Sequence, residues 1–135
     1  MGQFQLVNWW AVLAVTALNM FVGFLWYGPL FGTFWLSLVE KNRDEIEGGG
    51  ATTYLIPVAG ALASAVVLAV VISLLRVYTW WSGMAWGALL WFAFGATGLL
   101  TTGVFEERKR GLTWLFVSYM VLVHAAGGAI FAVWR

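Results

Sequence analysis

The chain has 135 residues, of which 62% are hydrophobic and only 10% are charged, and its formal net charge at pH 7 is +1. Such an apolar composition lies outside the range of soluble globular domains, and the small net charge argues against a nucleic-acid partner. The sequence contains no cysteine, which excludes disulfides, thiolate nucleophiles and cysteine-ligated metals. We therefore expect an all-α integral membrane protein that has membrane lipids as partners and needs no cofactor.

The charged residues gather in two segments, 40–47 and 106–110, and the remaining two are Arg76 and Arg135. Between them lie four uncharged stretches, at 6–27, 54–75, 83–105 and 112–134. At about 1.5 Å per residue, each forms a helix of roughly 33–35 Å, longer than the about 30 Å of the hydrocarbon core. A soluble four-helix bundle would need a polar stripe along each helix, which these stretches lack. The sequence predicts one transmembrane domain over 1–135, with four spanning helices in an up-down bundle.

The connection after the first span has two parts. Gly28 and Pro29 should end or bend the first helix, because proline has no amide hydrogen and its ring clashes inside a helix. Apolar residues then recur along one side of residues 29–39, which predicts a short helix lying in the membrane interface. Residues 40–53 are charged and contain three consecutive glycines, a composition typical of a flexible solvent loop.

Lysine and arginine are distributed unequally between the two sides of this bundle. The side with the first and third connections holds five of them, and the side with the termini holds two. The positive-inside rule therefore predicts both termini on the non-cytoplasmic side of the membrane, which we expect to be the cytoplasmic (inner) membrane. Arg108, Lys109 and Arg110 could contact lipid headgroups, although we favour a solvated turn that carries the orientation signal.

Rows of small residues on three spans predict close contacts between helices, because small side chains let helix backbones approach. They are Ala61, Ala65, Ala69 and Ser73 on the second span, Gly83 and Gly87 on the third, and Gly128 and Ala132 on the fourth. Packing within one chain is the interpretation we favour, and contact between subunits is the alternative.

Six polar or aromatic-hydroxyl residues lie at similar depths in the four spans and form a candidate intramembrane polar cluster. They are Thr16, Asn19, Ser64, Thr97, Tyr119 and His124. Counted from the side of the first and third connections, three lie about 15–18 Å deep and three about 10–12 Å deep. They could form a polar path or a small-ligand site centred on Asn19 and His124. We favour interhelical hydrogen bonds that fix packing, because no acidic residue accompanies them.

Enzymatic chemistry finds little support in the sequence. One histidine, with no cysteine and no carboxylate inside a span, cannot form a metal site or a buried acid–base pair. We therefore expect no catalytic, cofactor-binding or metal-binding residues and predict that the protein is not an enzyme.

Several short strings resemble those of the domain of unknown function 1761 family, which are small bacterial membrane proteins. The most specific string is Trp-Tyr-Gly-Pro-Leu-Phe-Gly at 26–32, followed by Trp35. The others are Asn8-Trp9, Phe105-Glu106-Glu107-Arg108, Tyr119, Gly128-Ala129-Ile130 and Trp134. Relatives tend to have glycine where Glu107 stands. The resemblance implies a four-helix membrane protein and implies no activity.

Three function classes remain open, and a lipid-acting enzyme is the one that we favour least. We expect a structural or accessory subunit that self-associates as a homo-oligomer or docks on a larger membrane complex. The alternative is a small channel, carrier or ligand-binding membrane protein with a polar layer around Asn19 and His124.

Overall fold

The computed structural model describes residues 5, 7–40 and 50–134. The helical elements in chain order are α2 (Trp9–Leu25), η1 (Trp26–Leu30), α3 (Gly32–Val39), α5 (Thr52–Leu74), α6 (Trp80–Trp91), η2 (Phe92–Ala96), α7 (Thr97–Phe105) and α8 (Arg110–Val133). Both η segments are π-helical. No β-strand occurs in these described ranges, and the predicted all-α class is confirmed.

Four helices are long and apolar enough to cross a membrane, as the sequence predicts. They are Trp9–Leu30, Thr52–Leu74, Trp80–Phe105 and Arg110–Val133, the first and third of which include the π-helical segments. The first begins three residues later than predicted because the side chain of Asn8 caps it, accepting from the amides of Trp10 at 3.0 Å and Ala11 at 3.2 Å. The third begins three residues earlier, because the helix starts directly after the extended residue Thr79.

The expected break at Gly28 and Pro29 takes the form of a wider helical turn. The helix continues through both residues to Leu30, and the amide of Phe31 donates to the carbonyl of Trp26 at 3.0 Å, the i−5 spacing of a π-helix. Widening the turn accommodates a proline that lacks a donor. The predicted interfacial helix at 29–39 is therefore α3, which begins only at Gly32. The predicted loop at 40–53 is shorter, because α5 begins at Thr52, and residues 41–49 of it lie outside the described ranges.

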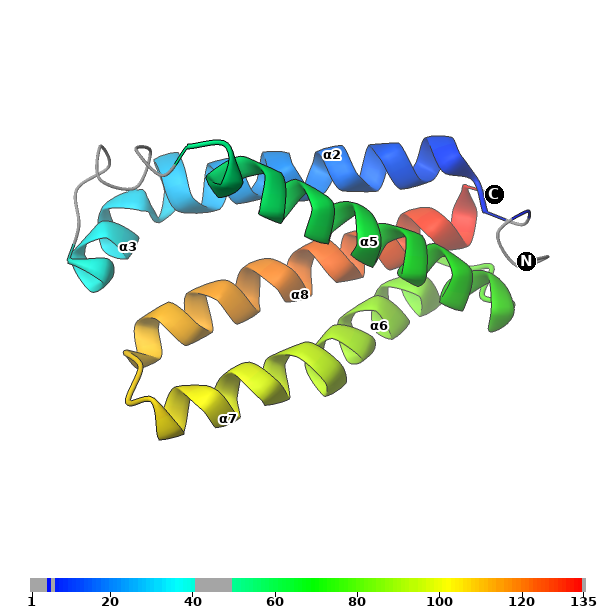
Figure 1. Cartoon of the computed structure of the whole chain (residues 1–135). Coiled ribbons are helices and arrows are strands. Elements are labelled where there is room, and N and C mark those ends of the chain that lie inside the picture. Colours follow the sequence, from blue (N-terminus) through cyan, green and yellow to red (C-terminus); the bar gives the residue numbers. More distant parts are fainter. Residues whose placement is uncertain (1–4, 6, 41–49, 135) are drawn as a thin grey trace.

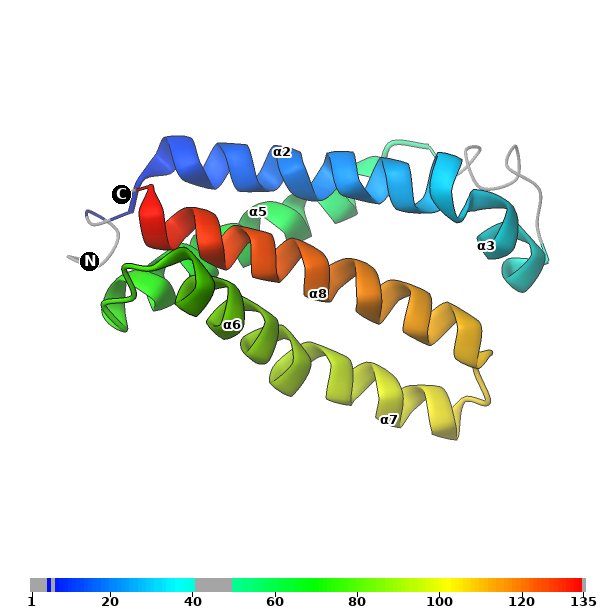
Figure 2. The same ribbon diagram turned by 180° about the vertical axis from the view of Figure 1, so that it is seen from behind.

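α8 is the helix on which the others pack. It contacts α2, α3, α5, α6 and α7, and its closest partner is α6. In Figure 1 the chain reverses direction between successive long helices, so the start of α2 and the end of α8 lie at one end of the molecule. The view from behind in Figure 2 shows α3 and the α7–α8 turn together at the opposite end.

The predicted rows of small residues are used for packing within the chain. A Cβ atom added to Gly83 would lie 2.2 Å from the carbonyl oxygen of Gly128, and one added to Gly87 would lie 2.0 Å from that of His124. The backbones of α6 and α8 are therefore in direct contact. On α5, Ala61, Ala65 and Ala69 of the predicted row are buried, and Ser73 is partly exposed.

The largest group of buried apolar side chains lies toward the end of the molecule that holds the start of α2 and the end of α8. Its members are Val7, Ala11, Val12, Val15, Ala65, Leu68, Ala69, Ile72, Val77, Phe131 and Ala132. This cluster fixes the relative positions of α2, α5 and α8, and the polar residues considered next lie beside it.

Candidate functional site

Tyr119 on α8 and Asn19 on α2 form a buried link between these two helices. The hydroxyl of Tyr119 donates to the backbone carbonyl of Asn19 at 2.8 Å and also reaches the side-chain oxygen Oδ1 of the same residue. Gly23, one turn further along α2, leaves room for the phenol ring, since a Cβ there would lie 2.8 Å from the hydroxyl oxygen. One hydroxyl proton is thus shared between two acceptors on α2.

A small pocket lies next to this link, between α2, α5 and α8. Its polar lining comes from Asn19, Ser64 and His124, and its apolar lining from Val15, Ala61, Ala65, Leu68 and Val123. The volume is about 10 Å³, roughly the space that one water molecule needs. Three residues of the predicted polar cluster therefore share one pocket, and Tyr119 is bonded to one of them.

The imidazole of His124 is fixed by its own helix and by α6. Its Nδ1 lies 2.7 Å from the carbonyl oxygen of Met120, and its ring stacks on Trp91 at a centroid distance of 5.2 Å. Because a carbonyl can only accept, Nδ1 carries the hydrogen and Nε2 is left as an acceptor. The indole nitrogen of Trp91 is buried and has no hydrogen-bond partner among the described residues.

A larger groove lies on the outer side of the same residues, between α5 and the α6–η2 segment. Its volume is about 510 Å³, and it is lined by Ala63, Ser64, Val67, Leu68, Val71, Leu90, Trp91, Phe94, Gly95 and His124. The groove opens sideways, because Val67 and Phe94 at its edge are 62% and 84% exposed. Ser64 and His124 also line the small inner pocket. A molecule in the groove, which is otherwise apolar, can therefore contact the polar atoms of these two residues.

The π-helical segment η2 shapes the wall of this groove. Gly95 lies beside the indole of Trp91, and a Cβ at that position would come within 2.1 Å of a ring carbon. The missing side chain of Gly95 and the wide turn of η2 therefore leave room for the Trp91 ring that packs against His124. π-Helical turns of this kind are frequent at functional sites.

Comparison with known proteins identifies the family. A family model described as "Protein of unknown function (DUF1761)" matches residues 10–132, nearly the whole chain. The chain belongs to the DUF1761 family. This confirms the resemblance seen in the sequence, and the description of DUF1761 assigns no activity. No curated protein and no solved structure matches.

Two members of the predicted polar cluster lie elsewhere in this DUF1761 fold. The hydroxyl of Thr16 donates to the carbonyl of Val12 at 2.8 Å, and that of Thr97 donates to the carbonyl of Ala93 at 2.7 Å. Each bond stays within its own helix, and neither threonine lines the inner pocket or the groove. Ser64 differs from both, because its hydroxyl makes no hydrogen bond to any described residue.

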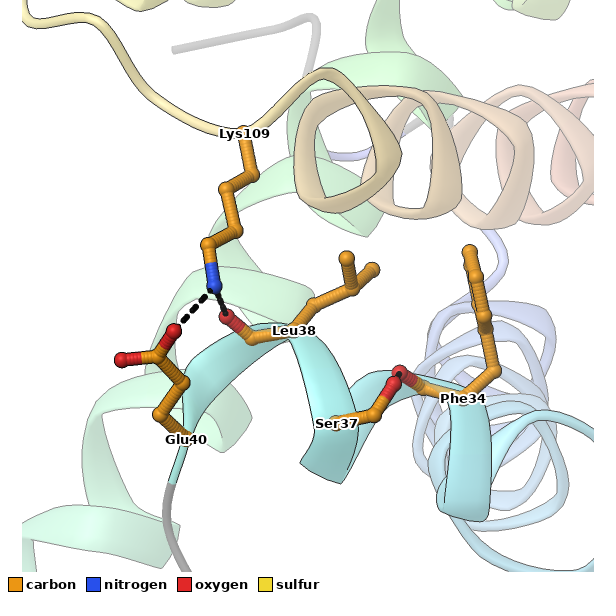
Figure 3. A network of polar contacts seen from close by, with 5 residues as sticks. All are labelled: Phe34, Ser37, Leu38, Glu40 and Lys109. Carbon is orange, nitrogen blue, oxygen red and sulfur yellow. Dashed lines mark hydrogen bonds and ion pairs between the residues drawn. The ribbon is translucent and has the colours of Figure 1, made fainter.

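The predicted headgroup residues of the DUF1761 chain have unlike surroundings. The ammonium of Lys109 donates to the carbonyl of Leu38 at 2.9 Å and to Oε1 of Glu40 at 2.8 Å (Figure 3). The hydrogen bond and the positive charge of Lys109 lower the pKa of the Glu40 carboxyl. Lys109 therefore ties the end of α3 to the α7–α8 turn. Arg108 and Arg110 line a second pocket, and Arg108 also borders the surroundings of Lys109 and Glu40.

Trp91, Gly95 and Met120 are the residues of the site that the sequence analysis did not find. The position of Trp91 in the sequence could have indicated the site, because tryptophans of membrane proteins usually lie at the two interfaces. Trp91 instead lies in the interior of the third span, stacked on the single histidine of the chain.

Proposed function

We propose that this DUF1761 protein binds, from within the bilayer, an apolar molecule that carries a hydroxyl group. The observation that supports it is the position of Ser64 and His124, which line both the open groove and the inner pocket. A ligand lying in the groove would bring its polar group to these two residues. Its apolar part would cover side chains such as Val67 and Phe94.

The chemistry of the two residues favours a hydroxyl over other polar groups. Nε2 of His124 can only accept while Nδ1 donates to Met120, so the ligand must supply a donor. The hydroxyl of Ser64 can then donate to the same ligand oxygen. A ketone or ether has no donor, and a carboxylate would meet no lysine or arginine in the described lining of the groove. Unpaired polar groups in hydrocarbon are unfavourable, so a molecule that pairs both is preferred.

Photocrosslinking in nanodiscs tests this proposal. The probe is a long-chain alcohol with a diazirine on its chain, and the matched control is its methyl ether, which lacks the donor. We expect the alcohol to label residues on the groove side of α5 and α6 about three- to fivefold more than the ether. Equal labelling by both probes would contradict the proposal.

A pair of variants locates the polar contact. His124→Phe keeps an aromatic ring against Trp91 and removes Nε2, so the preference for the alcohol should disappear. Thr97→Val removes a hydroxyl that bonds within its own helix and lines neither cavity, so the preference should remain. A preference that survives in His124→Phe would exclude His124 as the contact.

The structural or accessory role expected from the sequence is a second candidate. The surface that such a role could use is the outer face of α7, where Val104 and Phe105 are 76% and 83% exposed. Either lipid or a second protein chain can cover this face. Native mass spectrometry from nanodiscs separates the two, since a stable homo-oligomer or a co-purifying membrane subunit would support the accessory role.

Residence in the cytoplasmic membrane, with both termini on its outer side, stays a prediction. The chain lacks cysteine, so single cysteines report each side without background. We expect an impermeant maleimide to label Ser82→Cys in intact cells and to spare Glu106→Cys. The reverse labelling pattern would invert the orientation.

A further inference from the structure

The three consecutive basic residues at the α7–α8 turn do not have the same surroundings. Lys109 is bonded to Glu40 and to the end of α3. Arg108 and Arg110 make no side-chain hydrogen bond or ion pair with any residue that the structure describes. The charge of Arg108 acts on the phenol of Tyr27, but within the described part of the chain no acidic group neutralises either guanidinium, so both can pair with an anionic ligand.

Both arginines line one pocket of about 510 Å³ at the end of the third and fourth spans. Thr113 adds a hydroxyl to the lining, and Leu100, Val104 and Trp114 form an apolar side. The pocket lies where two spanning helices end in a charged turn. Its lining thus changes from charged residues at the turn to apolar residues along the two helices, in the same order as the headgroup and acyl chains of a phospholipid.

We propose that this pocket binds an anionic phospholipid, with the phosphate between Arg108 and Arg110 and an acyl chain against Trp114. Guanidinium groups pair with phosphate oxygens through two parallel hydrogen bonds, which favours arginine at such sites. Lys109 is not part of the site, because its ammonium is already engaged. The proposal does not depend on the groove between α5 and α6.

The charge of the pocket fits a headgroup with a single negative charge. Glu107 also lines it, so two arginines and one glutamate leave a net charge of +1. A phosphatidylglycerol headgroup carries one negative charge and neutralises this lining. Phosphatidylcholine adds a cationic choline to the same phosphate, and this choline would meet the arginines. The pocket should therefore prefer phosphatidylglycerol.

Native mass spectrometry of the full chain in detergent, with equal amounts of the two lipids, tests the site. We expect Arg108→Gln and Arg110→Gln each to lower the ratio of bound phosphatidylglycerol to phosphatidylcholine about fivefold. Lys109→Gln removes the same charge from the adjacent position and should change the ratio less than about twofold, because a charge outside the pocket is screened by salt. Glu107→Gln should raise the ratio.

Three results would overturn the proposal. The first is an unchanged ratio of bound phosphatidylglycerol to phosphatidylcholine in both arginine variants. The second is an equally large fall of this ratio in Lys109→Gln, which would show that the overall charge of the turn, and not the pocket, causes the preference. The third is competition by soluble glycerol phosphate at the concentration of the lipid, which would indicate an anion site without an acyl-chain contact. A higher ratio of phosphatidylglycerol to phosphatidylcholine in Glu107→Gln would support the site independently, because this variant leaves both arginines in place.

Discussion

The phenol oxygen of Tyr119 lies 2.8 Å from the backbone carbonyl oxygen of Asn19 and reaches the side-chain oxygen of the same residue. These two residues are 100 positions apart in the sequence, and both are buried. Inside a bundle of membrane-spanning helices no bulk water competes for this hydrogen bond. It therefore fixes both the spacing and the rotation of α2 relative to α8, beside the pocket that Asn19 shares with Ser64 and His124.

Replacing Tyr119 by phenylalanine should destabilise the protein by about 0.5–1.5 kcal/mol, because both oxygens of Asn19 lose this donor. Unfolding by a denaturing detergent in mixed micelles measures the change. Tyr54→Phe is the matched control, since Tyr54 is 57% exposed and should be neutral. Equal losses in the two variants would show that the bond adds nothing to stability.

Gly87 on α6 should tolerate no side chain. A Cβ there would lie 2.0 Å from the carbonyl oxygen of His124, so Gly87→Ala must separate α6 from α8, at a cost of about 2 kcal/mol or more. Gly98→Ala is the control, because nothing lies within 4 Å of its Cβ position. That change should be neutral or stabilising by up to about 1 kcal/mol. The same detergent unfolding measures both, and comparable losses would contradict the close approach.

Glu107 has a left-handed backbone conformation with a φ angle of 51°. Glycine adopts this conformation without the steric penalty of a Cβ atom. We therefore expect Glu107→Gly to raise the free energy of unfolding by about 0.5–1 kcal/mol.

The neighbouring residue provides the control for this prediction. Glu106 has a φ angle of −90°, so Glu106→Gly adds freedom to the unfolded chain without relieving strain. It should lower stability by about 0.5–1 kcal/mol. Thermal unfolding in detergent should therefore shift in opposite directions for the two variants, and shifts of the same sign would contradict the argument.

The contact between Lys109 and Glu40 should depend on pH. The folded pKa of Glu40 is lowered from its ordinary value of 4.5. The contribution of the pair is therefore fully present above that value and is lost as the pH falls through the lower folded pKa. An NMR titration of the Glu40 carboxyl should show the lowered pKa, and Lys109→Gln should return it toward 4.5. A titration unchanged by that substitution would rule out Lys109 as the cause.

The fold could be predicted because charge is confined to the connections. An ionised side chain inside hydrocarbon is unfavourable, so the uncharged stretches mark the spans directly. The ends of the helices were less well determined, since they depend on local bonds such as the cap made by Asn8. The π-helical turn at Pro29 was not predicted, because proline can end, kink or widen a helix and the sequence does not distinguish these outcomes.

The site could be predicted only in part. Counting residues along a span gives the depth of a side chain in the membrane, but it does not show toward which neighbouring helix the side chain points. Asn19, Ser64 and His124 meet in one pocket, whereas Thr97 lies at a similar depth and is exposed. A threonine can also satisfy its hydroxyl within its own helix, as Thr16 does. The π-helical turns add to the difficulty, since they change the rotation of every later residue.

The central position of α8 has a consequence for synthesis of the protein. α8 is the last of the four spans to leave the ribosome, so α6, whose main contacts are with α8, enters the bilayer before its packing partner exists. α2 and α5 contact each other and can pair early. α6 can pack only after α8 has been inserted, because Gly83 and Gly87 contact α8. A nascent chain that stalls before Arg110 would leave this glycine face of α6 covered only by lipid.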